Sequence, residues 1–354
     1  MKSTTLLFIA LLVFTLSCNN EPQIEEVDLP DYTVVDLDSF NVKPSLLLPV
    51  KMAVNKNLLI ILDLSTDTLF RVFNLPDLKY SGWFGKKGRG PREYYYIDPS
   101  GFRFYDDILQ IVDLRSIYFI NFTSEIICDN YDIRDKFSIP GELLTFNYIF
   151  KLDINNFCGL CQTLNSAKSL DKFNFQTKEI SSFIPYPDLV KEVPENAKRT
   201  VYSFSVEVKP ELDLFVMAYN FFPLIRICDK KGEINHEILV KKLPEQIVFQ
   251  QLGSRESNLL NGAIYYEDIK TTTKYIYLLY KPRKGIRVDE HQYEPYSIGS
   301  NELHIIDWEG QFVRRIKLSE KILSFAPSID DTYLYFTKDN IDRKIFRLNL
   351  KGKM

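Results

Sequence analysis

The chain has 354 residues, 45% of them hydrophobic and 26% charged, and its 44 Lys and Arg against 47 Asp and Glu give a formal net charge of −3. This composition is typical of a globular protein. It excludes a disordered, collagen-like or coiled-coil chain, and it excludes the broad basic surface of a protein that binds DNA or RNA. We therefore expect no nucleic-acid partner. The 26 Phe and 21 Tyr favour β-structure, and three His leave little room for a His-rich metal site.

The N-terminal segment is typical of an exported protein. Lys2 precedes an apolar run from Leu6 to Leu16, which is followed by the small residue Ser17 and by Cys18. A positive start, a short apolar run and a small residue before the cleavage point indicate a signal peptide. The run is shorter than the about 20 residues that a transmembrane helix needs. Residues 1–17 are therefore predicted to be removed.

The four residues Thr15-Leu16-Ser17-Cys18 resemble a bacterial lipobox, although Thr15 departs from its usual Leu. The resemblance implies that Cys18 carries acyl chains such as palmitate. Because Asn19 rather than Asp follows the cysteine, it also implies an anchor in the outer membrane, on its periplasmic or its surface-exposed side. The alternative is an ordinary signal peptide followed by a chance cysteine. Residues 18–31 are polar, and we expect a flexible tether there, joined to one monomeric domain over residues 32–354.

A short pattern recurs along the rest of the chain: an apolar strand that ends in Asn or Asp, two variable residues, a turn residue and a second apolar strand. Asn or Asp can hydrogen-bond its own backbone where a turn begins, and Gly supplies a positive φ where it ends, so the pattern predicts a hairpin. The six copies begin at Phe70, Tyr118, Asp171, Ile225, Leu303 and Ile345. Most follow one another after roughly 40–55 residues, a size typical of the blades of a β-propeller.

The last copy predicts how the ring closes. Only five residues follow Asn349, too few for a complete outer strand, so the sixth blade lacks its fourth strand. A spare strand lies upstream of the first blade, over Tyr32–Phe40, and we expect it to pair with residues Lys344–Leu348 and leave no open edge. The sequence therefore predicts an all-β, six-bladed β-propeller with four-stranded blades, closed by an N-terminal strand that completes the last blade.

A glycine-rich segment links the first blade to the second. Its structural residues are Gly85, Gly88, Gly90, Pro91 and Glu93, and its cations are Lys86, Lys87, Arg89 and Arg92. The segment is neither a P-loop nor a dinucleotide fingerprint, because no Gly-Lys-Ser/Thr ends it and a strand follows Pro91. Two interpretations stay open: a structural turn in which Glu93 pairs locally, and a loop that binds an anion through its cations.

Taken with the lipobox, the tether and the six units, this segment resembles the TolB-like six-bladed β-propeller lipoproteins of Bacteroides-type bacteria. The residues that match the motif are Gly88, Gly90, Pro91, Glu93 and Tyr94. The resemblance covers essentially the whole mature chain and implies the propeller fold and a location in the cell envelope. The family carries no settled biochemical activity, so the resemblance assigns no catalytic residue.

Signatures of propeller enzymes are scarce. The sequence contains no sialidase-type Asp box and no Gly-x-Ser-x-Gly elbow. The predicted inner strands carry Asp98, Glu207, Asp268 and Asp330, which a hydrolase or lyase acting on a glycan or a lactone would need to converge on the channel. Solvated carboxylates at strand ends are the simpler interpretation. We predict no catalytic residue, no metal and no cofactor.

The cysteines after Cys18 are Cys128, Cys158, Cys161 and Cys228. Cys158 and Cys161 have the spacing of a redox or zinc motif, but no second such pair and no nearby His completes a site. Buried thiols, a disulfide and redox chemistry all stay open, in that order of preference.

A second basic segment is inserted between the second and third strands of the fifth blade. Its candidate binding residues are Arg283, Lys284, Arg287, Tyr293 and Tyr296. In a propeller such a loop lies on the same face as the blade-to-blade loops, so both basic segments are predicted to share one face. We therefore expect a non-enzymatic binding protein for an extracellular glycan or peptide or for an envelope protein. An enzyme, a purely structural assembly partner and an insertion without function are the alternatives.

Overall fold

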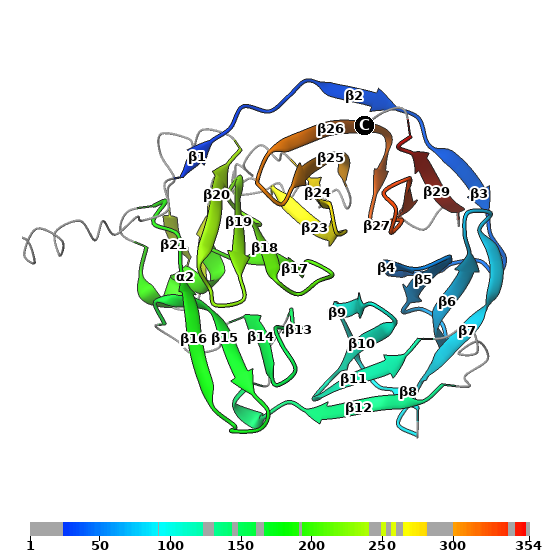
Figure 1. Ribbon diagram of the computed structural model, residues 1–354, viewed down its shortest axis with the longest axis horizontal. Coiled ribbons are helices and arrows are strands. Elements are labelled where there is room, and N and C mark those ends of the chain that lie inside the picture. Colours follow the sequence, from blue (N-terminus) through cyan, green and yellow to red (C-terminus); the bar gives the residue numbers. More distant parts are fainter. Residues whose placement is uncertain are drawn as a thin grey trace, which may run out of the picture.

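A computed structural model of the chain shows six β-sheets arranged as blades around a central axis (Figure 1). The structure describes residues 24–90, 92–122, 131–143, 148–160, 166–190, 193–240, 249–252, 256–259, 265–281, 300–338 and 344–351. The all-β, six-bladed propeller predicted from the sequence is therefore confirmed. In each blade the strands run in chain order from the axis to the rim, with the exceptions described below.

The strands of the six blades are as follows. Blade one consists of β4 (Pro49–Asn55), β5 (Leu58–Asp63), β6 (Thr68–Asn74), β7 (Lys79–Lys87) and the short β8 (Glu93–Tyr94). Blade two consists of β9 (Ile97–Tyr105), β10 (Ile108–Asp113), β11 (Ser116–Asn121) and β12 (Ile133–Ser138). Blade three consists of β13 (Phe150–Lys151), β14 (Asn156–Leu160), β15 (Lys168–Asn174) and β16 (Ile180–Pro185). Blade four consists of β17 (Phe204–Val208), β18 (Leu214–Tyr219), β19 (Leu224–Asp229) and β20 (Ile234–Leu239). Blade five consists of β23 (Tyr266–Thr271), β24 (Tyr275–Tyr280), β25 (Ser300–Asp307) and β26 (Phe312–Ile322). Blade six consists of β27 (Ser324–Pro327), β28 (Tyr333–Thr337), β29 (Lys344–Asn349) and the N-terminal β3 (Asp38–Asn41).

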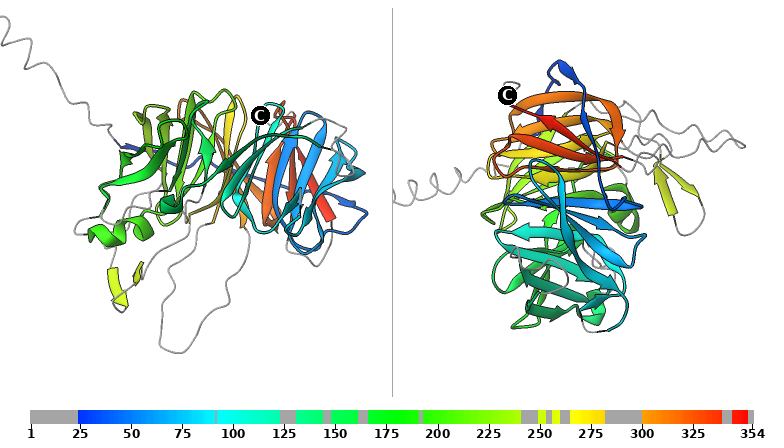
Figure 2. Two further views of the ribbon diagram at one scale, coloured as in Figure 1. Left: turned by 90° about the horizontal axis from the view of Figure 1, so that it is seen from below. Right: turned by 90° about the vertical axis from the view of Figure 1, so that its right-hand side faces the viewer.

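The remaining elements are short. They are β1 (Glu25–Glu26), β2 (Tyr32–Val35), the hairpin β21 (Phe249–Leu252) and β22 (Glu256–Leu259), the 3-10 helix η2 (Gly141–Leu143) and the helix α2 (Glu195–Val201). Helix α2 and the hairpin lie in connections that lead from one blade to the next, and both protrude on the same side of the ring (Figure 2). We call this side, where each innermost strand begins, the connection face. Within the described ranges, no helix has the length and apolar character needed to cross a membrane.

The N-terminal strand closes the ring, as predicted, but over fewer residues. β3 pairs antiparallel with β29, with Asn41 opposite Lys344 and Asp38 opposite Arg347. The prediction of one strand over Tyr32–Phe40 was wrong in its first half, because β2 pairs in parallel with β26 of blade five. Val35 is buried in the core between blades five and six, and this burial holds the chain at the rim of blade five before it reaches blade six.

The N-terminal segment therefore covers the rims of three successive blades (Figure 1). β1, which lies in the segment expected to be a tether, pairs in parallel with β20 of blade four. β2 and β3 then follow on blades five and six. Each added strand occupies backbone groups that would otherwise form an open sheet edge.

The repeated hairpin turns have the chemistry expected from their residues. The carboxylate of Asp229 accepts hydrogen bonds from the amides of Lys231 and Glu233 at 2.8 and 2.9 Å. Gly232 follows with a φ of 89°, in the left-handed region that favours glycine. A Cβ at Gly232 would also lie 2.5 Å from the ring of Phe183 in blade three. Turn geometry and contact between blades thus require the same glycine.

The core lies between the blades rather than at the axis. Blades one and two share one cluster, in which the rings of Phe70 and Phe84 stack with centroids 4.5 Å apart and Phe102 of blade two joins them. Other clusters join blades four and five, five and six, and six and one. Because the apolar faces are used between blades, the other face of each innermost strand is left for polar groups along the axis.

Candidate functional site

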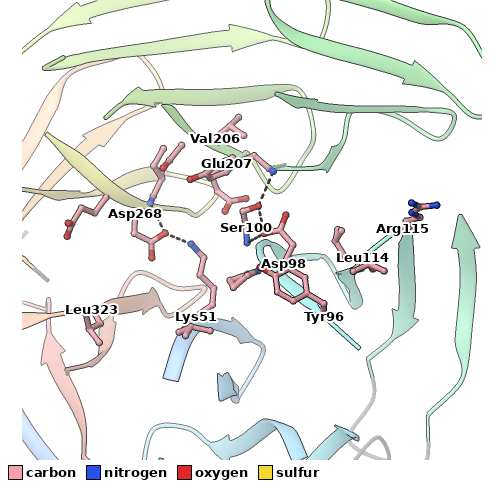
Figure 3. A pocket seen from close by; sticks show the side chains of 17 residues that line it. Lys51, Tyr96, Asp98, Ser100, Leu114, Arg115, Val206, Glu207, Asp268 and Leu323 are labelled. Carbon is pink, nitrogen blue, oxygen red and sulfur yellow. Dashed lines mark hydrogen bonds and ion pairs between the residues drawn. The ribbon is translucent and has the colours of Figure 1, made fainter. Parts of the chain in front are cut away.

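A cavity of about 730 Å³ opens at the axis on the connection face. Blades one, two, four and five contribute to its wall, chiefly through the first residues of their innermost strands, and Tyr148 and Leu323 add to it just before the innermost strands of blades three and six (Figure 3). The charged residues of the wall are Lys51, Asp98, Arg115, Glu207, Glu267 and Asp268. A cavity with convergent polar groups on a rigid scaffold is the first place to look for a binding site.

Two ion pairs cross the axis at the floor of this cavity. Lys51 of blade one pairs with Asp268 of blade five (Figure 3), and Arg103 of blade two donates to Glu207 of blade four at 2.8 Å. Burial alone would lower the pKa of Lys51, but the ion pair with Asp268 raises it above its ordinary value. Each pair joins two blades that are separated by one other blade, so together the pairs form a preorganised polar floor.

The carboxylates that were considered as catalytic candidates are already bonded. Asp98, Glu207 and Asp268 do reach the same cavity, as a hydrolase would require. The Asp98 carboxylate, however, accepts from the amide and hydroxyl of Ser100 at 2.9 and 2.7 Å, and the other two belong to the ion pairs. Asp330 lies in a turn after β27 and accepts from Thr332 and Ser328. Among the described residues, no group of three or more His, Cys, Asp or Glu could hold a metal. The hydrolase or lyase interpretation gains no support from this geometry.

The glycine-rich segment folds around the side chain of Glu93. Its carboxylate accepts from the amide of Gly90 at 2.7 Å, and the amide of Gly88 donates to the carbonyl of Tyr94 at 3.0 Å. A Cβ at Gly88 would lie 2.0 Å from Glu93 Oε2, so no other residue fits there without moving the carboxylate. Gly85 has a φ of 68° and lies against Phe70. The structure thus agrees with the interpretation as a structural turn; Pro91 lies outside the described residues.

The four cations of this segment are exposed, and three of them lie over aromatic rings. Arg89 is 4.5 Å from the ring centroid of Tyr95, Lys86 is 5.4 Å from that of Trp83, and Arg92 is 5.9 Å from that of Tyr131. Lys87, the fourth, is exposed at the end of β7. Because Gly88 and Gly90 already use their amides, the segment can reach an anion through these side chains rather than through a nest of amides.

An aromatic rim joins the glycine-rich segment to the cavity. Tyr95 and Tyr96 are 50% and 64% exposed, and Leu114 beside them is 54% exposed. Asp113 holds both tyrosines in place by accepting from their amides at 3.2 and 2.6 Å. Tyr96 and Leu114 line the cavity directly (Figure 3). The sequence analysis did not identify this rim, although the run of tyrosines directly after Glu93 was a visible signal.

Blade one has the same arrangement, in which an Asp carboxylate accepts hydrogen bonds from the amides of two exposed residues. Asp63 accepts from the amides of Leu47 and Leu48, both at 2.8 Å, and both leucines are exposed on the connection face. In each of these two blades an Asp at the end of the second strand fixes two exposed apolar residues ahead of the first. The connection face thus carries ordered apolar side chains on neighbouring blades.

The second basic segment, with Arg283, Lys284, Arg287, Tyr293 and Tyr296, lies outside the described residues, as do Cys18, Cys128 and Cys161. Its place of attachment is described. Lys281, directly before it, pairs with Glu267 in the cavity wall at 2.5 Å, and Ser300 directly after it donates to the carbonyl of Tyr280. The described residues that flank the insertion, Lys281 and Ser300, therefore lie on the connection face, and the position of the basic residues between them stays a prediction.

The described cysteines are buried and free. Cys158 and Cys228 have no disulfide partner, as the buried-thiol interpretation expected. Burial raises the pKa of Cys158 well above its usual range and that of Cys228 to about 12. Neither thiol is in the state that redox chemistry needs.

Comparison with known proteins agrees with the fold. The sequence model of the family described as TolB-like 6-blade propeller-like matches residues 32–330. The chain belongs to this family. No curated protein matches the chain significantly.

Two solved structures share the fold. A member of the DUF4221 family from Bacteroides vulgatus is 13% identical, with a TM-score of 0.55, over 88% of this chain and 99% of that one. A protein from Bacteroides fragilis that is named as exported is 14% identical, with a TM-score of 0.57, over 92% of this chain and 98% of that one. At these identities the likeness shows the propeller fold alone.

Proposed function

We propose that this TolB-like propeller is a non-enzymatic binding protein whose ligand site is the connection-face cavity with its aromatic rim, and that the ligand is an acidic oligosaccharide. The observation that carries the proposal is the juxtaposition of Arg89, Tyr95 and Tyr96 at the cavity mouth. Exposed tyrosines offer flat surfaces for sugar rings, and a cation beside them pairs with an acidic group.

The charges of the site favour an anionic ligand. The carboxylates of the cavity are bonded to Lys51, Arg103, Lys281 or Ser100. The exposed cations Lys87 and Arg115 make no ion pair with any described residue, and Arg115 lines the cavity. An acidic sugar would therefore meet cations at the rim and ion pairs at the floor, where the Asp98 carboxylate is held by Ser100.

The rigidity of the site supports binding. Asp113 fixes the backbone of Tyr95 and Tyr96, and the ion pairs of the floor join non-adjacent blades. Groups that are ordered before binding lose little conformational entropy when the ligand arrives. An ordered site of this kind favours recognition of a particular ligand over non-specific adhesion.

The cellular place of this function rests on the N-terminus. We propose that Cys18 is acylated and anchors the propeller in the outer membrane, where the ligand or an envelope protein partner is met. Two acyl signals make anchoring stable, since each buried CH₂ adds roughly 0.8 kcal/mol. A Cys18→Ala variant should lose labelling by palmitate and leave the membrane fraction, and label retained in that variant would contradict the anchor.

The binding proposal is tested on an array of acidic and neutral oligosaccharides. Wild type should bind acidic members in a salt-sensitive way. Arg89→Ala and Tyr96→Ala should each weaken binding about tenfold, or ~1.4 kcal/mol. Arg134→Ala is the matched control, because Arg134 is an exposed arginine on β12 that pairs only with its neighbour Asp135. Binding unaffected by Arg89→Ala and Tyr96→Ala, or a preference for acidic peptides over all glycans, would overturn the proposal.

A further inference from the structure

A second cavity lies at the other end of the axis, on the face opposite the connection face. It has a volume of about 230 Å³ and is lined where the innermost strands end. Glu207 borders both cavities, so the crossing ion pairs separate the two. A single water needs only about 10–15 Å³ of such space, so a small ligand fits here.

Lys270 of β23 is an unpaired buried cation in this cavity. It lines the wall, it is 7% exposed, and it forms no hydrogen bond or ion pair with any described residue. Asp268 lies two positions earlier on the same strand and is already paired with Lys51. A buried charge without a partner is costly, so a native cavity that keeps one is a candidate anion site.

Charges of both signs surround Lys270, but its ammonium has no direct partner among the described residues. Lys51 and Arg103 are held by Asp268 and Glu207, and the exposed Asp106 also lines the cavity. Arg103 donates through Nη1 to Glu207 and through Nη2 to the carbonyl of Ser100, while its buried Nε has no partner. Hydrogen-bond donors on Lys270 and Arg103 therefore remain unused among the described residues.

We propose that the opposite-face cavity is a binding site for a small monocarboxylate whose carboxylate pairs with Lys270. The single unpartnered ammonium of Lys270 matches one carboxylate. A phosphate carries nearly two negative charges at neutral pH and prefers the fork of a free guanidinium, and the Nη atoms of Arg103 are occupied. The side chains of Asn55 and Thr271 donate to backbone carbonyls, so Lys270 is the principal donor.

The energetics of Lys270 agree with this assignment. Burial, together with the neighbouring Lys51, lowers the pKa of Lys270 to about 8. A carboxylate bound beside the ammonium would offset this effect and keep the lysine charged. This site lies at the other end of the axis from the proposed glycan site, so a substitution of Lys270 leaves the aromatic rim unchanged.

The test is isothermal titration of sodium acetate into wild type, Lys270→Met and Lys56→Met, at constant ionic strength. Lys56 is an exposed lysine in the β4–β5 turn, on the same face but outside the cavity, and it serves as the matched control. Acetate should bind wild type and Lys56→Met with one site, and Lys270→Met at least tenfold more weakly. Lys270→Gln is the second variant, and melting curves show that each variant is folded.

Three outcomes would overturn the proposal. A wild-type protein that shows no binding at an acetate concentration about 50 times a low-millimolar Kd has no such site. If Lys270→Met and wild type bind acetate with equal affinity, Lys270 does not take part in the binding site. Sulfate or phosphate that binds wild type as tightly as acetate would show that the site does not select a monocarboxylate.

Discussion

Replacing Lys270 by Met should stabilise the protein at neutral pH, which is an unusual expectation for a cavity residue. The lysine is buried, and no described residue offers it a partner. Methionine has a similar length and no charge, so it removes the desolvated ammonium without opening a large void. None of the apolar clusters between the blades includes this side chain.

The size of the effect follows from the pKa. Burial and Lys51 lower the pKa of Lys270 from 10.5 to about 8, a difference of roughly 2.5 units at about 1.4 kcal/mol each. The charged lysine therefore costs the folded state up to about 3 kcal/mol at pH 7. Between pH 8 and pH 10.5 the unfolded chain binds a proton at this residue that the folded chain does not, so wild-type stability rises with pH there. The advantage of Lys270→Met should shrink over this window.

The assay is guanidinium denaturation of both proteins at pH 7, 8, 9 and 10, followed by the fluorescence of Trp83 and Trp308. Comparing the two proteins at each pH cancels the titration of all other groups. Saturating acetate should also narrow the gap at pH 7, since a bound anion offsets the same charge. A Lys270→Met protein that is less stable than wild type at pH 7, or a gap that does not change with pH, would refute the reasoning.

Three further predictions follow from the fold. Gly88→Ala should melt well below wild type, because its Cβ would lie 2.0 Å from the carboxylate that closes the loop, whereas Gly141→Ala, with nothing within 4 Å, should melt unchanged. Removing residues 1–41 should cause aggregation in light scattering, because β20, β26 and β29 lose their N-terminal partner strands, and removing only residues 1–23 should not; equal behaviour would refute the role of these strands. Cys228 should resist iodoacetamide at pH 8 until the protein is unfolded, because burial raises its pKa to about 12; mass spectrometry of its peptide decides.

The fold could be predicted because its turns carry local signals. Asp229 and Gly232 act within one hairpin, and an Asn or Asp followed three residues later by a turn residue marked each blade. The missing outer strand of blade six followed from counting the residues after Asn349. The parallel pairing of β2 with β26 could not be foreseen, since it depends on where the rim of blade five lies in space.

The sites were only partly predictable, because they depend on which face of a strand points to the axis. Asp268 and Lys270 stand two positions apart on β23, a pattern that a solvent-exposed strand also shows. Only the closed ring turns that face into the wall of a cavity. Glu93 was considered as a locally pairing residue, and it does pair locally, whereas Tyr95 and Tyr96 were not considered as binding residues.

The innermost strands largely separate apolar packing from axial charge. In β17, Val206 and Val208 belong to an apolar cluster between blades and also border one axial cavity each, while Glu207, which lies between them, borders both cavities. In β23, Ile269 is in the core and also borders the connection-face cavity, and its charged neighbours line the two cavities. Because successive side chains of a strand point to opposite faces, the charged axial residues can change with less effect on the packing between blades than these apolar residues. The propellers from Bacteroides vulgatus and Bacteroides fragilis share this fold at 13% and 14% identity, which is the behaviour such a separation permits. The ligand of any one propeller is therefore to be sought in its axial and rim residues, and not in the fold that carries them.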